Sequence, residues 1–401
     1  MRRYWFMRVL LLANLAGILP CAAVFLLVQN NVWLAMVLSA LLLVASACVF
    51  SHLLYIQHLR EADRIAEEAR FKDAILRFVQ ESSGMKTRED LYSLILETAV
   101  QSIPHATAGS LLKVITQDTA YGLPQQDVEH TPKIPPKERQ TRFEAAYGHD
   151  MTILKDLNLR LEETFNYVLT KGKCDRTVVV HNYQDLNREL LDPERYAQLE
   201  SGTSDISSSS IMSAPVTVEG VLWGMLTIDS AAGFDFTEQH IQRLDVFVNE
   251  TVKIIRLFRE QERNLWLMRH DPLTGLLNRS HFTEMFKADL QAAARGEVSG
   301  VLISMDLDHF KSINDHFGHV HGDEALVHFS RVFAAYLKKG DYLSRYGGDE
   351  FVAVFRNSDL DEAIERIQTI ARALSENPLF IGTSREPLRF SHGMVDRKSV
   401  V

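Results

Sequence analysis

The chain is poor in cysteine and carries no excess of positive charge. Among its 401 residues only Cys21, Cys48 and Cys174 are cysteines, with no C-x-x-C pair and no histidine at metal-ligand spacing. This pattern excludes a disulfide framework and a zinc site, and it suits a reducing cytosol. The formal net charge of −9, without a basic stripe, indicates that nucleic acid is not a partner. With 46% hydrophobic residues, the length predicts two globular units plus further segments.

Two runs near the N-terminus lack Asp, Glu, Lys and Arg altogether. They cover residues 9–28 and 32–56, and three polar residues separate them. A helix needs about 20 residues to cross a hydrocarbon core, so residues 1–57 are predicted to form a transmembrane helical hairpin. Basic residues on both outer flanks place everything after the hairpin in the cytoplasm. A cleaved signal peptide is the alternative for the first run, and the second run close behind it favours the hairpin.

Helical and then strand patterns follow the hairpin. Residues 58–80 are amphipathic and predict a linker helix, which leads into a first domain over residues 71–257. Residues 117–139 have no periodicity and predict a loop. Helices at both ends with a sheet between them predict an α+β fold. The helix candidate is Asp90 to Ser102, and the strand candidates are Ala108 to Val114, Thr177 to Val180, Met212 to Val218 and Leu222 to Asp229.

Two stretches of this first domain carry a resemblance to a known family. They are SAPVTVEGVLWGMLTIDS, with Gly220 at a turn where positive φ is expected, and FDFTEQHIQRLDVFVNETV, a closing helix. They make residues 71–257 resemble a GAF domain, a sensor fold that binds small molecules and proteins. The resemblance implies control of the chain by a GAF ligand and leaves that ligand unknown.

The closing helix continues toward residue 269 without Gly or Pro. Its seam residues are spaced alternately by four and three as far as Phe258, with an interruption at Glu262, which is a pattern like that of a coiled-coil seam. Packing on its own domain explains the first half of the seam. For the second half, within residues 240–269, a parallel two-stranded stalk and therefore a homodimer are predicted. The seam consists of Leu244, Val248, Thr251, Ile255, Phe258 and Leu265.

A short apolar strand at 301–305 ends at Asp306, and a helical pattern follows at once. Ligands bind at the carboxyl ends of strands in open α/β sheets, and the N–H groups of a helix start suit phosphate. Lys311 adds a positive charge there. Magnesium commonly binds one or two carboxylates together with substrate phosphates. This spacing therefore predicts a nucleotide site with a divalent cation.

A second acidic feature is SRYGGDEFVAVF, where Gly347 to Glu350 join two predicted strands. The glycines permit a tight turn with positive φ. A solvated acidic turn is the plain alternative, but it does not explain Asp306 at the end of the neighbouring strand. Burying unpaired acids is costly. Together the three acids predict a carboxylate cluster that binds a divalent cation.

Three motifs then occur in order: DPLTGLLNR, DLDHFKSINDHFGHVHGDEAL and RYGGDEF. They make residues 264–401 resemble the GGDEF-domain diguanylate cyclases. The resemblance implies an α/β fold like that of nucleotidyl cyclases and polymerase palms, with a mainly antiparallel sheet. It implies a reaction that joins two GTP molecules into cyclic di-GMP and two pyrophosphates, with Mg²⁺ or Mn²⁺ as cofactor. It also implies two facing domains in a homodimer, at the inner (cytoplasmic) membrane of a bacterium.

The same resemblance implies roles for individual residues. Asp349 and Glu350 are the implied catalytic residues, acting on the ribose 3′-OH. Asp306, Asp349 and the carbonyl of Leu307 are the implied metal ligands. The implied substrate-binding residues are Lys311 with the backbone N–H groups of His309 and Phe310 for phosphates, Asn314 and Asp323 for the guanine edge, His319, and Gly347 and Gly348, which leave room for the substrate.

The sequence departs from the family pattern in two places. Lys338 and Asp341 stand where the family has the R-x-x-D product-inhibition motif, and lysine lacks the bidentate fork of arginine. We therefore expect weak or absent product inhibition. The family continues beyond the position of Val401 into a phosphate-binding helix and a strand, so we expect a C-terminally incomplete domain. The alternatives are a catalytically silent GGDEF/GAF signalling or interaction protein and, third, adenylate-cyclase-like chemistry.

Overall fold

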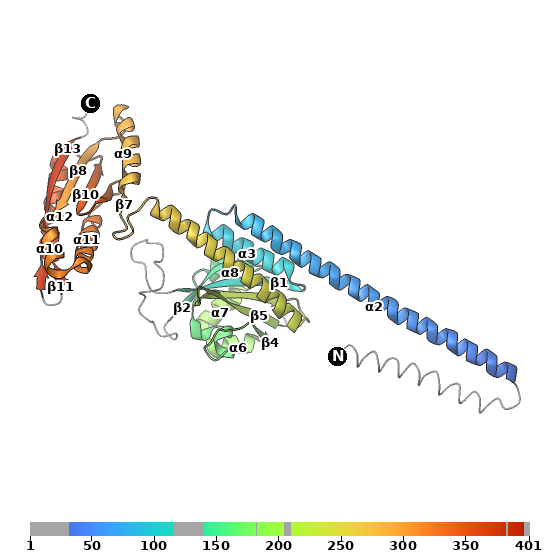
Figure 1. Cartoon of the computed structure of the whole chain (residues 1–401). Coiled ribbons are helices and arrows are strands. Elements are labelled where there is room, and N and C mark those ends of the chain that lie inside the picture. Colours follow the sequence, from blue (N-terminus) through green and yellow to red (C-terminus); the bar gives the residue numbers. More distant parts are fainter. Residues whose placement is uncertain (1–31, 116–138, 182, 204–209, 382–383, 397–401) are drawn as a thin grey trace. The chain divides into compact units, whose positions relative to one another are not determined.

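A computed structural model describes residues 32–115, 139–181, 183–203, 210–381 and 384–396 (Figure 1). The chain divides into two compact units, and the main part of the second begins within the long helix α8 at Val252. The predicted first membrane run and the predicted loop at 117–139 lie outside the described residues, apart from Arg139. The helices of the first unit are α2 (Val32–Ser82), α3 (Arg88–Ser102), α4 (Met151–Leu154), α5 (Phe165–Leu169), α6 (Tyr183–Leu190), α7 (Pro193–Gly202) and the first part of α8 (Glu238–Leu267).

Helix α2 joins the second apolar run and the predicted linker without a break. In the described part of the chain it is the one helix long and apolar enough to cross a membrane, with a mean hydropathy of 2.0 and no buried share in its apolar window. Figure 1 shows it as a single extended rod. The structure thus confirms one candidate span and leaves the hairpin as a prediction.

The first unit is built on a six-stranded sheet in the order β3-β2-β1-β6-β5-β4. Helices α3 and α8 and the end of α2 lie on one face, and α6 and α7 lie on the other (Figure 1). Phe78 of α2 packs on Phe247 of α8 with ring centroids 5.1 Å apart. Every predicted strand is present, whereas β2 and β3 were missed. The strands are β1 (Ala106–Ile115), β2 (Gln140–Tyr147), β3 (Asn158–Arg160), β4 (Val178–His181), β5 (Ser210–Val218) and β6 (Val221–Ser230).

Strands β5 and β6 form the predicted hairpin. Gly220 has a φ of +79° and Glu219 a φ of +53°. Positive φ at both central residues is the geometry of a type I′ turn, whose twist matches that of the flanking strands. The prediction of positive φ at Gly220 is therefore confirmed.

The predicted seam of α8 is mostly buried. Leu244, Thr251 and Phe258 are at most 8% exposed, whereas Leu265 is 57% exposed. The first five seam residues are thus part of a core and are not available to a partner. The apolar residues that α8 exposes are Val246, Leu257, Leu265 and Leu267.

The second unit has a five-stranded sheet in the order β13-β8-β10-β9-β7. Neighbours are antiparallel except for the parallel pair β7 and β9. This confirms the mainly antiparallel sheet. The elements are β7 (Leu277–Asn278), α9 (Arg279–Ala294), β8 (Gly300–Leu307), α10 (Phe310–Phe317), α11 (His319–Ala334), β9 (Tyr342–Gly347), β10 (Glu350–Arg356), α12 (Leu360–Glu376), β11 (Leu379–Ile381), β12 (Ser384–Glu386) and β13 (Phe390–Asp396).

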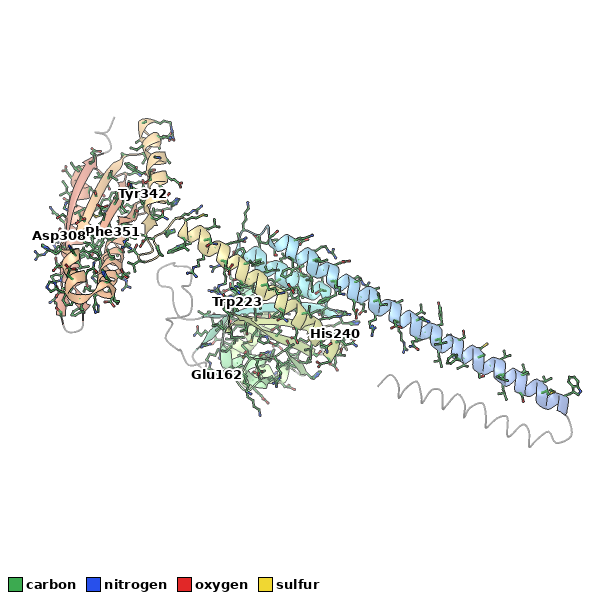
Figure 2. The ribbon with its side chains drawn as sticks, in the orientation of Figure 1. Glu162, Trp223, His240, Asp308, Tyr342 and Phe351 are labelled. Carbon is green, nitrogen blue, oxygen red and sulfur yellow. The ribbon has the colours of Figure 1, made fainter. Side chains whose placement is uncertain are left out.

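Alternation along the strands builds one core on each face of this sheet. On one face Phe351 packs on Phe329 of α11 with centroids 4.5 Å apart. On the other face Tyr342 meets Phe282 of α9 at 5.4 Å (Tyr342 and Phe351 are labelled in Figure 2). Because β8 and β10 are the inner strands, their ends hold fixed positions, and the acidic residues lie at those ends.

Candidate active site

The acidic residues of β8 and β10 lie directly opposite each other. Antiparallel pairing places Glu350 across from Asp306, and Asp306 also faces Ser391 on β13. The backbone N–H of Leu307 donates to the carbonyl of Asp349 over 3.3 Å. Asp306 and Glu350 are exposed and Asp349 is half-buried. The register therefore brings Asp306 to the adjacent acids Asp349 and Glu350, which lie more than 40 positions further along the sequence.

Electrostatic crowding is visible at Asp306. Burial raises the pKa of its carboxyl, and the neighbouring charges of Asp349, Glu350 and Asp308 raise it further. Like charges close together disfavour ionisation. The cluster is thus a concentration of negative charge that a cation would relieve.

The turn between β9 and β10 is open toward solvent. A Cβ added to Gly347 or Gly348 would meet no atom within 4 Å. Only Gly348 has positive φ, at +55°, so the expectation of positive φ holds for that residue alone. Open space in front of both glycines leaves the acids accessible to a large ligand.

Arg345 holds this turn in place. Its Nε donates to the carbonyl of Gly348 over 2.9 Å, and its Nη1 lies 3.3 Å from both carboxylate oxygens of Asp271. Asp271 in turn accepts from the backbone N–H of Thr274. Sequence reasoning missed this pair, although Asp271 and Arg345 stand in two of the quoted motifs. Asp271 and Arg345 carry opposite charges and stand in two motifs that are expected to form one site. This could have predicted the ion pair.

Helix α10 begins immediately beyond the acidic cluster. His309 is its N-terminal cap residue and adopts a left-handed conformation, with φ of +59° and no side-chain capping bond. The first N–H groups of a helix have no partner within the helix, and here the side chain of the cap residue does not accept from them, so they suit an anion. Phe310 anchors the helix on the core, and Lys311 is exposed beside it. Asp308, which was missed, accepts from the hydroxyl of Ser391 over 2.7 Å (Asp308 is labelled in Figure 2).

The residues predicted to read guanine lie on two consecutive helices. Asn314 is on α10, and His319 and Asp323 are exposed on α11. Gly322, a buried residue of α11 that sequence reasoning missed, lies against Asn314 of α10. A Cβ on Gly322 would lie 2.0 Å from Oδ1 of Asn314. A glycine inside a helix lowers helix stability by about 1 kcal/mol relative to alanine. Its presence within a helical pattern could therefore have predicted a close approach by another group.

On the guanine-binding role that the motif resemblance implies for Asn314, Gly322→Ala is expected to raise the KM for GTP about tenfold, with little change in melting temperature. The new methyl group meets the end of a flexible side chain, so Asn314 moves away and the fold persists. Loss of one good hydrogen bond corresponds to about 1.4 kcal/mol, or tenfold. Steady-state kinetics and thermal unfolding measure both quantities. Gly84→Ala is the control, because its Cβ would meet only the carbonyl of Glu81 at 3.6 Å. An unchanged KM in Gly322→Ala would contradict the role of Asn314.

The acidic cluster does not form a complete metal site by itself. In the described residues no group of three or more His, Cys, Asp or Glu is arranged to hold a metal ion. Magnesium usually keeps waters and binds one or two carboxylates plus phosphate oxygens. The carboxylates of Asp306 and Asp349 fit that partial donor set.

The predicted product-inhibition residues have other partners. Asp341 has a fully buried side chain and pairs with Arg366, and Nζ of Lys338 lies 2.5 Å from Glu362. Asp341 also accepts from the N–H groups of Lys338 and Arg356. It is therefore part of the folded core of the unit, and weak product inhibition stays a prediction.

Comparison with known families assigns both domains. Residues 268–397 match the family described as "Diguanylate cyclase, GGDEF domain", and residues 90–254 match the GAF domain. The chain thus carries a GAF domain followed by a GGDEF domain.

Individual relatives match parts of the chain. The probable diguanylate cyclase DgcC of Escherichia coli K12 is 35% identical over 136 residues, covering 34% of this chain and 36% of that protein. Diguanylate cyclase DgcP of Pseudomonas aeruginosa is 27% identical over 234 residues, covering 56% and 34%. The chain spans about a third of the length of these relatives. The coiled coil and GGDEF domain of DgcB from Caulobacter crescentus, solved with c-di-GMP, has a TM-score of 0.34 at 24% identity, covering 39% of this chain and 87% of that chain.

Proposed function

We propose that the chain is a diguanylate cyclase, condensing two GTP molecules into cyclic di-GMP and two pyrophosphates. The observation that carries the proposal is the register of β8 and β10, which sets Asp306 opposite Glu350 beside the open glycine turn. The start of α10 supports it, because a helix N-terminus without a side-chain cap, together with Lys311, suits the phosphates of a nucleotide. The curated relatives that match this domain bear the name diguanylate cyclase.

In this proposal Asp306, Asp349 and the carbonyl of Leu307 hold Mg²⁺, with Mn²⁺ as a substitute. Bound there, the cation would neutralise charge on the phosphate that is attacked. Asp349 or Glu350 takes the proton of the ribose 3′-OH. Lys311 and the N–H groups at His309 and Phe310 bind the phosphates. Asn314 and Asp323, with His319 nearby, bind the guanine edge.

Two facing GGDEF domains are needed, because each binds one GTP, so we propose a homodimer. The buried seam residues of α8 are excluded as its contact. The exposed residues Val246 and Leu257 are 11 positions apart and therefore share one face of the helix. Leu257→Glu tests this face, because it places a charge there and should disrupt the dimer in sedimentation experiments. An unchanged dimer would refute this face as the contact.

We further propose that residues 1–57 anchor the chain in the membrane, and that the GAF and GGDEF domains lie in the cytoplasm under GAF control. The exposed apolar window of α2 supports anchoring. Membrane fractions should contain the chain, and detergent but not high salt should release it. Recovery of the chain in the soluble fraction would refute the anchor.

The proposal is tested by incubating the purified full chain with Mg²⁺ and GTP and measuring cyclic di-GMP. ATP serves as the control for adenylate-cyclase-like chemistry. Binding of GTP without product at high protein concentration would support the alternative of a catalytically silent signalling protein.

A further inference from the structure

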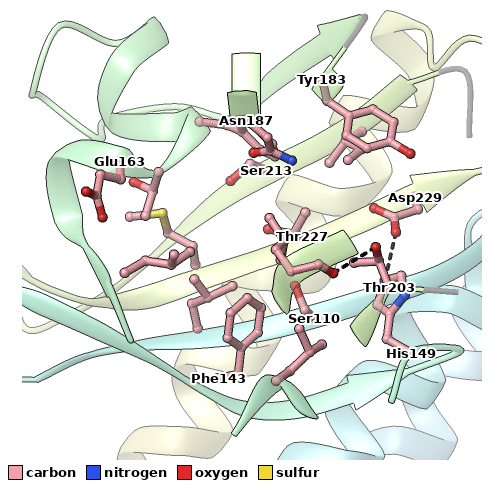
Figure 3. Close-up of a pocket in the computed structure, with 18 of the residues that line it drawn as sticks. Ser110, Phe143, His149, Glu163, Tyr183, Asn187, Thr203, Ser213, Thr227 and Asp229 are labelled. Atoms are coloured by element: carbon pink, nitrogen blue, oxygen red, sulfur yellow. Dashed lines mark hydrogen bonds and ion pairs between the residues drawn. The ribbon is translucent and has the colours of Figure 1, made fainter. Parts of the chain in front are cut away.

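The GAF domain contains a cavity of about 260 Å³ between its sheet and helices α4 to α7. Figure 3 shows side chains from the strands and from the covering segments pointing into it. Since one water occupies about 30 Å³ in the liquid, the cavity has room for roughly nine non-hydrogen atoms. The GGDEF site does not use this cavity.

Strand pairing places residues of neighbouring strands side by side on the floor of the cavity. Thr227 of β6 lies between Ser110 of β1 and Ser213 of β5, so three hydroxyl-bearing residues form one row across three strands. Two positions further along β6, on the same face, is Asp229, with Ile211 of β5 beside it. The floor is therefore polar at the end marked by Asp229.

Asp229 is a buried carboxylate with capacity for a further donor. Its Oδ2 lies 2.8 Å from Nε2 of His149, and the two side chains are 9% and 6% exposed. Gly148 permits this approach, because it has φ of +73° and a Cβ there would lie 2.9 Å from Ala108. The contact with His149 uses one lone pair of Oδ2, so the carboxylate keeps acceptor capacity. A carboxylate accepts several hydrogen bonds, and a buried one needs them.

The second buried carboxylate in the wall, Glu163, is already saturated. It accepts from the side chains of Arg160 and Arg195 and from the N–H of Arg160. Burial alone would raise the pKa of Glu163, but these hydrogen bonds outweigh burial and lower the pKa to about 2. Glu200, which also lines the cavity, is exposed, so Asp229 is the buried carboxylate among the described lining residues that can meet a ligand.

No cationic Lys or Arg is among the described residues that line the cavity, and both arginines around Glu163 lie outside the lining. The hydroxyl and amide groups of the wall can donate to an anion, but no full positive charge would balance it there. The wall also has apolar and aromatic parts, which include Phe143, Leu154 and Tyr183. Aromatic faces attract cations.

We propose that the GAF cavity binds a small amine with an apolar or aromatic body, whose N–H groups bond to Asp229 and to the hydroxyl row. The body of the amine packs against Phe143 and Leu154. This inference names a ligand class for the proposed control by the GAF domain. Only the effect of ligand binding on the second domain rests on that proposed function. Because the test reads binding alone, its failure leaves the cyclase proposal standing.

The experiment compares three probes of similar size on the purified full chain: 2-phenylethylamine, 2-phenylethanol and phenylacetate. Calorimetry is expected to show binding of the amine at least tenfold tighter than that of phenylacetate. In Asp229→Asn the affinity for the amine should fall at least tenfold, while that for the alcohol stays the same. Asp235→Asn is the matched control, because it removes an exposed carboxylate of the same domain that pairs with His181.

Thr227→Val is a second variant, which removes one hydroxyl of the row with nearly the same shape. This variant is expected to lower the affinity for the amine several-fold. It keeps the test decisive if Asp229→Asn fails to fold. Three results would overturn the proposal. They are no binding of the amine to the wild type, phenylacetate binding as tightly as the amine, and an amine affinity that neither Asp229→Asn nor Thr227→Val changes.

Discussion

Asp306→Asn is expected to lower the rate of cyclic di-GMP synthesis by about 10³-fold, the scale seen when one electrostatic contact to a transition state is removed. Asparagine keeps the shape of the side chain and removes its charge at the end of β8. The cluster then loses the carboxylate that faces Glu350, and with it a proposed metal ligand. The measurement is product formation at saturating GTP and Mg²⁺.

The same substitution is expected to raise the melting temperature slightly in the absence of nucleotide. The pKa of Asp306 in the folded chain lies above its usual range, through burial and the charges of Asp349, Glu350 and Asp308. The folded state therefore binds this proton more tightly than the unfolded state does. The ionised carboxylate lowers stability at neutral pH, and the loss disappears as the pH falls through the raised pKa. Catalysis has the opposite dependence and declines over that same interval.

Asp361→Asn is the control for this pair of effects, since it removes an exposed carboxylate from α12 in the same unit. Its rate should stay near that of the wild type. Two outcomes would contradict the role of Asp306: a comparable loss of rate in the control, or a loss in Asp306→Asn that is explained by unfolding.

Asp341→Ala is expected to destabilise the GGDEF unit by about 3–5 kcal/mol, the usual loss when one partner of a buried ion pair is removed. The carboxylate of Asp341 is fully buried and pairs with Arg366, which is 12% exposed. Arg366 also stacks on Phe355, 3.7 Å from the ring centroid. Without Asp341 this guanidinium is left partly buried and unpaired, together with two backbone N–H groups.

Calorimetric unfolding of the full chain measures this effect in the transition of the second unit. Asp361→Ala, at an exposed position in the first turn of α12, should change the stability by less than about 1 kcal/mol. Equal effects of the two variants would contradict the structural role of Asp341. For the same reason product inhibition is better tested with Lys338→Arg, which restores the guanidinium and should tighten inhibition by cyclic di-GMP.

The sequence predicted the GGDEF half well, because its motifs mark strand ends and turns. Asp306 and Glu350 were assigned to one site from two distant motifs, and the sheet register confirms that they meet. Gly322 and Asp308 were missed because their roles depend on contacts between elements. The burial of Asp341 was missed for the same reason, since no local pattern reveals that Arg366 of α12 reaches it.

The GAF half was predicted less completely. Its long strands β5 and β6 are mostly buried runs of nine and ten residues and were found, whereas β3 and α4 have three and four residues and no usable periodicity. The seam of α8 was read correctly as apolar, but spacing alone does not tell a core from a partner interface. The cavity around Asp229 arises from the register of three strands, which the sequence does not encode locally.

The most direct test of the central claim is synthesis of cyclic di-GMP by the purified full chain, with Asp306→Asn measured in parallel. The account predicts cyclic di-GMP from GTP and Mg²⁺ by the wild type, none from ATP, and about 10³-fold less by a folded Asp306→Asn variant. Absence of product from the wild-type dimer at high concentration, or equal rates for the two proteins, would contradict it.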